Sequence, residues 1–174
     1  MFRQIDQYGI VKGCTVYCVT EGVVDDAPCT IDADVSLPQI AHPSYTMQCM
    51  GDMEIADHTR INAMTTGINC ELGVIQSRLL GKGVQSYVVR WAQEVKRDNG
   101  VFELVSFVAY ISGTPREDVS ATVRPGENTT GTVNIDTVKY RLVADGKEIR
   151  YIDRLAGILK INGVDYRAEI NAML

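Results

Sequence analysis

The sequence has no excess of lysine and arginine, no CxxC pair and no long apolar run. Its formal net charge is −5, whereas a protein that grips nucleic acid through its phosphates carries an excess of cations. The charge therefore argues against tight DNA or RNA binding. No stretch approaches the about 20 apolar residues of a membrane span, and the polar residues 1–7 lack the apolar core of a signal peptide. We expect no membrane partner.

The cysteines do not form a recognisable framework. Their number, five, is odd, and no pair has the spacing of a zinc knuckle. Cys14 and Cys18 are four residues apart, which places them on one face of a strand. We expect partly buried free thiols in a reducing cytoplasm.

Few residues are candidates for catalysis or metal binding. The two histidines are His42, before a proline, and His58, in an acidic segment that we interpret as a solvated turn. Gly81-Lys82-Gly83 lacks the frame of a phosphate loop. Glu103 is the one acid on an otherwise apolar strand face, and such a residue more often pairs with an arginine than acts as a catalyst. We expect no catalytic residue, no metal and no cofactor.

Strand and turn signals dominate the 174 residues, which we interpret as a single domain. Asp145-Gly146 and Asn162-Gly163 are strong two-residue hairpin signals. Three short strands and a terminal helix are expected around them. The other expected strands are Gly13–Thr20, Thr30–Leu37, Tyr45–Met50, Thr59–Leu72 with a possible bulge at Gly67, Val84–Lys96, Val101–Ser112 and Thr132–Ala144. Met53–Asp57 is interpreted as a short acidic segment, and Val74–Leu80 is the best internal helix candidate.

The Val84–Lys96 and Val101–Ser112 strands form the clearest hairpin, with a turn at Arg97–Gly100. The second strand is apolar on both faces. An antiparallel strand usually has one wet face, so this one lies either in the middle of a sandwich or at a subunit contact. Tyr87 and Trp91 are spaced for core packing or a subunit contact more than for a stacking platform.

Residues Gly113 to Gly131 form the most polar stretch, rich in proline and glycine. A loop of this length in a compact domain is usually functional or ordered by a partner. We interpret it as an assembly arm, whose deletion should leave a folded domain that no longer polymerises.

The order of these elements resembles the major tail tube proteins of contractile-tailed bacteriophages and related phage-tail-like particles. The resemblance extends from about Val35 onward, and residues 1–30 do not match. It rests on Leu37-Pro38, on Tyr45 to Ile55 with Gly51, on the Val84–Ser112 hairpin, and on Tyr140-Arg141-Leu142 with Ile149, Ile152-Asp153, Ile161 to Asp165 and Leu174.

The resemblance implies a mainly-β fold: a two-sheet β-sandwich or barrel-like domain with one short flanking helix and a long loop or arm. It also implies hexameric rings whose inner sheets join around a lumen and which stack into a tube. The implied partners are further copies of the chain, the tail sheath protein, baseplate and tail terminator proteins, and DNA that passes through the lumen without sequence-specific binding. The protein would belong to the virion tail and be made in the host cytoplasm.

Site residues are assigned on the same basis. We place Val101, Val105 and Phe107, with Arg116 and Arg124 of the arm, at contacts between subunits. Thr132, Asn134 and Asp136 alternate on one strand face and are assigned to the lumen.

Two alternatives remain open. A cytoplasmic small-molecule-binding β-barrel, with or without catalysis, would be a monomer that retains a ligand. A headless tail-like particle or a secretion-system tube would share the ring-forming role with a phage tail.

Overall fold

The computed structural model describes residues 7–20, 22–25, 29–31, 33–48, 52–71, 79–96, 100–116, 120–121 and 123–173, and the fold is mainly β as predicted. The strands are β1 (Gln7–Thr20), β2 (Val23–Val24), β3 (Thr30–Ile31), β4 (Asp34–Ser36), β5 (Ser44–Gln48), β6 (Asp52–Ala56), β7 (Met64–Glu71), β8 (Gln85–Lys96), β9 (Phe102–Pro115), β10 (Ser120–Ala121), β11 (Thr130–Ala144), β12 (Lys147–Asp153), β13 (Ile158–Ile161) and β14 (Val164–Asp165), followed by helix α2 (Ala168–Met173).

Both predicted two-residue turns are present. Asp145 and Gly146 have φ values of 48° and 73°, and Ala144 pairs with Lys147 across the turn. Asn162 and Gly163 have φ values of 51° and 83° and join β13 to β14. Positive φ at both central residues defines a type I′ turn, whose twist matches that of the flanking strands. The local sequence therefore sets the register of the C-terminal meander, and the short terminal helix follows it as expected.

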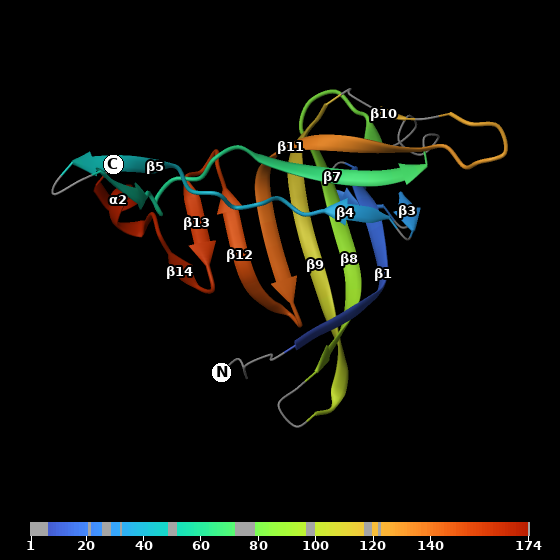
Figure 1. Cartoon of the computed structure of the whole chain (residues 1–174), viewed down its shortest axis with the longest axis horizontal. Coiled ribbons are helices and arrows are strands. Elements are labelled where there is room, and N and C mark those ends of the chain that lie inside the picture. The colour runs from blue at the N-terminus through green and yellow to red at the C-terminus, as the bar shows by residue number, and fades with distance from the viewer. Residues whose placement is uncertain are drawn as a thin grey trace.

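The main sheet has the antiparallel order β14-β13-β12-β11-β9-β8-β1-β2, and the long strand β11 belongs to two layers. Its residues 130–137 pair with β7, residues 135–144 pair with β9, and residues 139–144 pair with β12. β4 joins β7 on the other side. β7 and the first half of β11 run across the face of the longer strands (Figure 1). The result is a two-layer, sandwich-like fold, and β5 and β6 form a separate two-stranded hairpin.

The core lies between these two layers. Alternate residues of β7 are buried, among them Met64 and Ile68, and Val133 and Ile135 of β11 are fully buried beside them. These side chains belong to one cluster with Tyr87, Val89, Ile111 and Tyr140 of the main sheet. Thr66 and Thr137 are the buried polar pair between β7 and β11, and their hydroxyls are hydrogen-bonded at 2.6 Å.

Several sequence expectations need correction. The predicted strand Thr30–Leu37 forms two short strands because β3 pairs with β1 whereas β4 pairs with β7 in the other layer. There is no bulge at Gly67, since the register of β7 with β11 is continuous through it. The polar stretch Gly113–Gly131 is shorter as a loop than expected, because its ends belong to β9 and β11 and its middle contains β10. Residues 74–78 of the expected helix and 97–99 of the expected turn lie outside the described residues.

The expectation that all cysteines are free thiols is wrong for two of them. Cys18 and Cys29 form a disulfide, with their Cα atoms 5.9 Å apart. Spacing alone did not reveal this pair because the chain turns back after β1, and β2 and β3 then pair antiparallel with that strand. The Cys29 amide donates to the Val16 carbonyl, which holds the second cysteine beside the first. Cys70 is a buried free thiol.

Gly113 lies where β9 meets the point at which β11 passes from one layer to the other. It is buried, and a Cβ placed on it would overlap the backbone carbonyl of Asp136. By contrast, a Cβ on Gly67 would make only ordinary contacts, the nearest at 3.5 Å from Ser36 Cβ.

Replacing Gly113 by alanine should therefore lower the free energy of unfolding by roughly 1–3 kcal/mol, because backbone must move to relieve the overlap. Gly67→Ala is the matched control and should be neutral or stabilising by up to about 0.5 kcal/mol. Urea unfolding of the unassembled protein measures both. Equal effects of the two substitutions would contradict this description of the corner.

Asp153 ends β12 with a side chain that is only 4% exposed. Its carboxylate accepts hydrogen bonds from the amides of Leu155 and Ala156 and pairs with Lys139 Nζ at 2.9 Å. Burial alone would raise the pKa of Asp153, but these hydrogen bonds and the lysine charge together hold it below its ordinary value. The ion pair and the two hydrogen bonds from backbone amides thus fix the turn between β12 and β13.

Asp153→Asn should cost roughly 1–3 kcal/mol of unfolding free energy at neutral pH. Because the folded pKa is depressed, the contribution is complete above the unfolded value of about 3.9 and is lost as pH falls through the folded value. Denaturant unfolding of the wild type and the variant from pH 7 to pH 2 checks this. The two stabilities should converge at the acid end, and a difference independent of pH would argue against the ionised carboxylate as its cause.

Candidate assembly surface

The strand β9 has one face in the core and one face in solvent, and both are apolar. Val105, Ala109 and Ile111 on the inner face are at most 5% exposed. On the outer face, Phe102 is 59% exposed and Leu104 is 63% exposed. Large apolar side chains clustered on one face of a sheet indicate an interaction site more than isolated ones do. This outer face, with Phe102, Leu104, Val108 and Tyr110 of β9 at its centre, is called the β9 outer face below.

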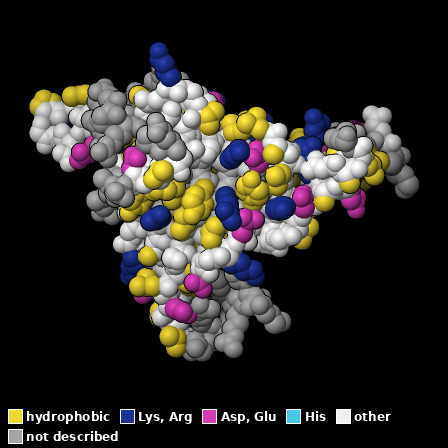
Figure 2. Space-filling model, turned by 180° about the vertical axis from the view of Figure 1, so that it is seen from behind, with side chains coloured by type: hydrophobic (Ala, Val, Ile, Leu, Met, Phe, Trp, Pro, Cys, Tyr) yellow, Lys and Arg dark blue, Asp and Glu magenta, His cyan; other side chains and the backbone are white. Residues whose placement is uncertain are grey.

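Charged residues of the neighbouring strands β8 and β11 lie beside the β9 outer face. The register places Arg90 of β8 opposite Val108 and Arg141 of β11 opposite Tyr110. The Arg90 guanidinium lies 4.9 Å from the centre of the Tyr17 ring, and that of Arg141 lies 5.9 Å from the Tyr110 ring. Arg141 also pairs with Glu148 at 2.6 Å. Figure 2 shows this face, with hydrophobic side chains gathered in its middle between basic and acidic ones. Such a mixture is typical of protein–protein contacts.

The residues that we assigned to subunit contacts lie in different places. Val105 and Phe107 are 5% and 7% exposed and belong to a core cluster with Val95 and Ala144. The Phe107 ring stacks on Trp91 with centroids 5.2 Å apart, so core packing accounts for both aromatics. Val101, just before β9, is 57% exposed. The protomer itself thus buries Val105 and Phe107, and any contribution of theirs to a subunit contact would be indirect.

The two arginines of the expected arm are exposed. Arg116 pairs with Asp136 at 2.7 Å, which anchors the start of the loop to β11. Arg124 forms an i,i+3 pair with Glu127 at 3.8 Å. Exposed pairs of this kind stabilise a fold little. The described residues 123–129 project from one end of the molecule (Figure 1).

Thr132, Asn134 and Asp136, which we assigned to the lumen, share one half-exposed face of β11, opposite to the buried Val133 and Ile135. The cross-strand partners on this face include Thr65 and Asn69 of β7. The structure therefore brings the three residues together on a polar surface, although Asp136 is neutralised by Arg116.

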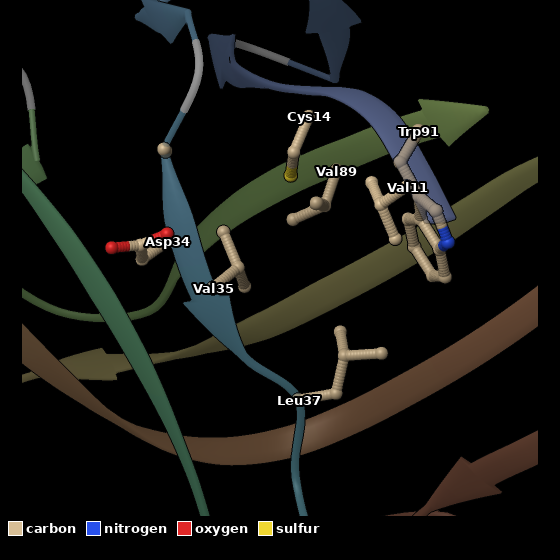
Figure 3. A pocket seen from close by; sticks show the side chains of 8 residues that line it. Val11, Cys14, Asp34, Val35, Leu37, Val89 and Trp91 are labelled. Carbon is tan, nitrogen blue, oxygen red and sulfur yellow. The ribbon is translucent and has the colours of Figure 1, made fainter. Parts of the chain in front are cut away.

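A pocket of about 340 Å³ opens between β1, β4 and β8. Its lining is mainly aliphatic, from Val11, Val35, Leu37 and Val89, with Trp91 at one side. The Asp34 carboxylate also borders it but is turned away from these side chains (Figure 3). The volume suits a small apolar ligand, and Cys14 and Ala33 complete the lining.

His42 precedes β5 and His58 follows β6, and both make local contacts. Their rings meet edge-on with centroids 4.9 Å apart, and His42 Nδ1 lies 2.7 Å from the Arg60 carbonyl. Asp57 accepts hydrogen bonds from the Thr59 amide and hydroxyl, which lower its pKa most, so this acid closes a turn. Within the described ranges, no three His, Cys, Asp or Glu side chains are grouped to hold a metal ion. In the same part of the chain, no helix has the length and apolarity to cross a membrane.

Sequence reasoning found the double apolar pattern of β9 but chose its inner face for subunit contacts. Period-two alternation separates the two faces without showing which one points inward. It also missed how exposed the β5–β6 hairpin is: every described residue except Ile55 is exposed, including Tyr45, Met47 and Met53.

The fold and these surfaces define a mainly-β protein that presents an exposed apolar sheet face. A family model for phage tail tube protein FII matches residues 20–174, and the chain belongs to that family. The match begins further upstream than the resemblance from Val35 suggested. The chain is thus a phage tail tube protein by family.

A curated relative agrees with this assignment. The tail tube protein of Escherichia phage P2 is 32% identical to this chain over 92 residues. The aligned stretch covers 53% of this chain and 53% of the P2 protein, so the chain spans about half the length of the relative it matches.

Proposed function

We propose that this chain assembles into hexameric rings that stack into the tube of a contractile phage tail. The rings enclose a lumen through which DNA passes. The tail sheath protein surrounds the tube, and baseplate and terminator proteins close its two ends. The protein acts through its surfaces and carries out no reaction.

The observation that carries this proposal is the β9 outer face. Removing apolar surface from water contributes about 25 cal/mol per Å², and a neighbouring copy of the chain can cover this surface. Rings also pair or cover sheet edges, which otherwise invite disordered association. The exposed arginines on the same face supply polar contacts at the edge of such an interface.

The polar face of β11 is our candidate for the lumen. Thr132 and Asn134 are neutral, and Asp136 is held by Arg116, so this face offers few cations to DNA phosphates. The net charge of −5 works in the same direction. A lumen with little positive charge lets a polyanion slide instead of binding it. The projecting loop around Arg124 is our candidate for contacts between stacked rings.

Leu104→Glu tests the β9 outer face. The side chain is 63% exposed, so the protomer should fold normally. Burying a charge in place of a leucine removes about 1.5–3 kcal/mol of apolar stabilisation per contact and adds a desolvation cost. The critical concentration for assembly should rise roughly tenfold or more. Sedimentation velocity and negative-stain microscopy measure assembly, and circular dichroism confirms folding.

Leu104→Met is the matched control, because it keeps an apolar side chain of similar volume at the same site, and it should assemble as the wild type does. Equal assembly of Leu104→Glu and the wild type would contradict the role of this face. A wild type that remains a small monomer at all concentrations and retains a small molecule, for which the 340 Å³ pocket has room, would favour the ligand-binding barrel instead.

A further inference from the structure

The charges of this chain are unevenly distributed along the sequence. Residues 13–59 contain no lysine or arginine, and all but two of the cations lie from Arg60 onward. The same segment carries eight acids: Glu21, Asp25, Asp26, Asp32, Asp34, Asp52, Glu54 and Asp57. In a chain with this distribution, the acidic surface of one copy can bind the basic surface of another copy.

Three arginines converge on a second pocket, of about 190 Å³. Arg60 comes from the connection between β6 and β7, Arg154 from the turn after β12, and Arg167 from the residues just before α2. Gly157, which also lines the pocket, has a φ of 67°, and a Cβ on it would stand 3.6 Å from Arg167 Cζ. The guanidinium of Arg167 therefore packs against the backbone of Gly157. This site is called the arginine pocket below.

The arginine pocket has a donor without an acceptor. Arg167 Nε is buried, and among the described residues no group accepts a hydrogen bond from it. A buried donor without a partner lowers the stability of the fold, and most buried donors in native structures do have a hydrogen-bond partner. Arginine prefers carboxylates or phosphates as partners, which its planar group can bind with two parallel hydrogen bonds.

The nearby carboxylates are already engaged. Asp153 binds Lys139 and two backbone amides, as described above. Asp165 accepts a hydrogen bond from the Arg167 amide, and Asp57 accepts two from Thr59. Among the described residues that line the pocket, the three arginines outnumber the single carboxylate, Asp153. The arginines that line the pocket can bind an additional anion there.

Two exposed acids, Asp34 and Glu71, lie at the other end of the molecule. Asp34 begins β4 and Glu71 ends β7, and both are exposed. In the described part of the chain neither forms an ion pair, and their cross-strand neighbours are the neutral Asn69 and Thr130. Figure 1 shows β4 and the end of β7 far along the long axis from α2 and β14, beside which the arginine pocket lies.

We propose that the arginine pocket of one copy binds the carboxylates of Asp34 and Glu71 of the next copy, so that the chains associate head to tail. Contacts between unlike surfaces at opposite ends generate closed rings or open filaments, whereas contacts between like surfaces stop at a dimer. The inference rests on the proposed tube function and names a polar contact that gives the assembly its direction.

Charge reversal followed by mixing tests the pairing. Arg154→Glu and Glu71→Arg each place like charges at the contact, so each should raise the critical concentration roughly tenfold. Lys82→Glu and Asp52→Arg change the net charge by the same amounts at exposed positions outside the proposed contact, and both should leave the critical concentration within about twofold of the wild type. An equimolar mixture of Arg154→Glu and Glu71→Arg should assemble nearly as well as the wild type, because the two variants alternate with complementary ends.

Sedimentation velocity at low and high salt provides the readout, with circular dichroism to confirm folding. The loss in each single variant should shrink at high salt, where exposed charges are screened. If the wild type assembles but neither variant is impaired, or if both are impaired and the mixture does not recover, the pairing is wrong while the tube function stands. If the wild type itself never assembles, the tube function is contradicted and the pairing with it.

Discussion

The structure depends on the burial of apolar surface on both sides of one strand. The inner face of β9 completes the core of the protomer, with Ala109 and Ile111 almost inaccessible to solvent. Its outer face presents Phe102, Leu104 and Tyr110 to water. A monomer gains nothing from this second face, and large exposed patches favour aggregation. A tube subunit gains from it in every contact with an identical neighbour, which reconciles the apolar strand with a folded, acidic protein.

The two-layer arrangement leaves that face open. Because β11 takes part in both layers, β7 and β4 cover the inner side of the main sheet while its outer side has no second layer of described elements. The passage of β11 between layers requires the close approach at Gly113. The same strand carries the polar residues that we place in the lumen. One long strand thus connects the core, the polar face and the sheet that carries the β9 outer face.

The sequence predicted those parts of the fold that depend on near neighbours. Asp145-Gly146 and Asn162-Gly163 specify their turns locally, and alternation predicted β8, β9 and β11. It could not show that Cys18 meets Cys29, since that contact depends on how β3 returns to β1. Nor could it show that Val105 and Phe107 point inward, because a strand can present either face to its core. The arginine pocket was invisible for the same reason, as Arg60, Arg154 and Arg167 are distant in sequence and meet only through the fold.

A cryo-electron microscopy reconstruction of the purified protein tests the central claim most directly. The account predicts rings or tubes in which neighbouring copies cover Phe102, Leu104 and Tyr110. A folded monomer at high concentration that leaves these three side chains in contact with water, or an assembly in which they remain uncovered, would contradict it.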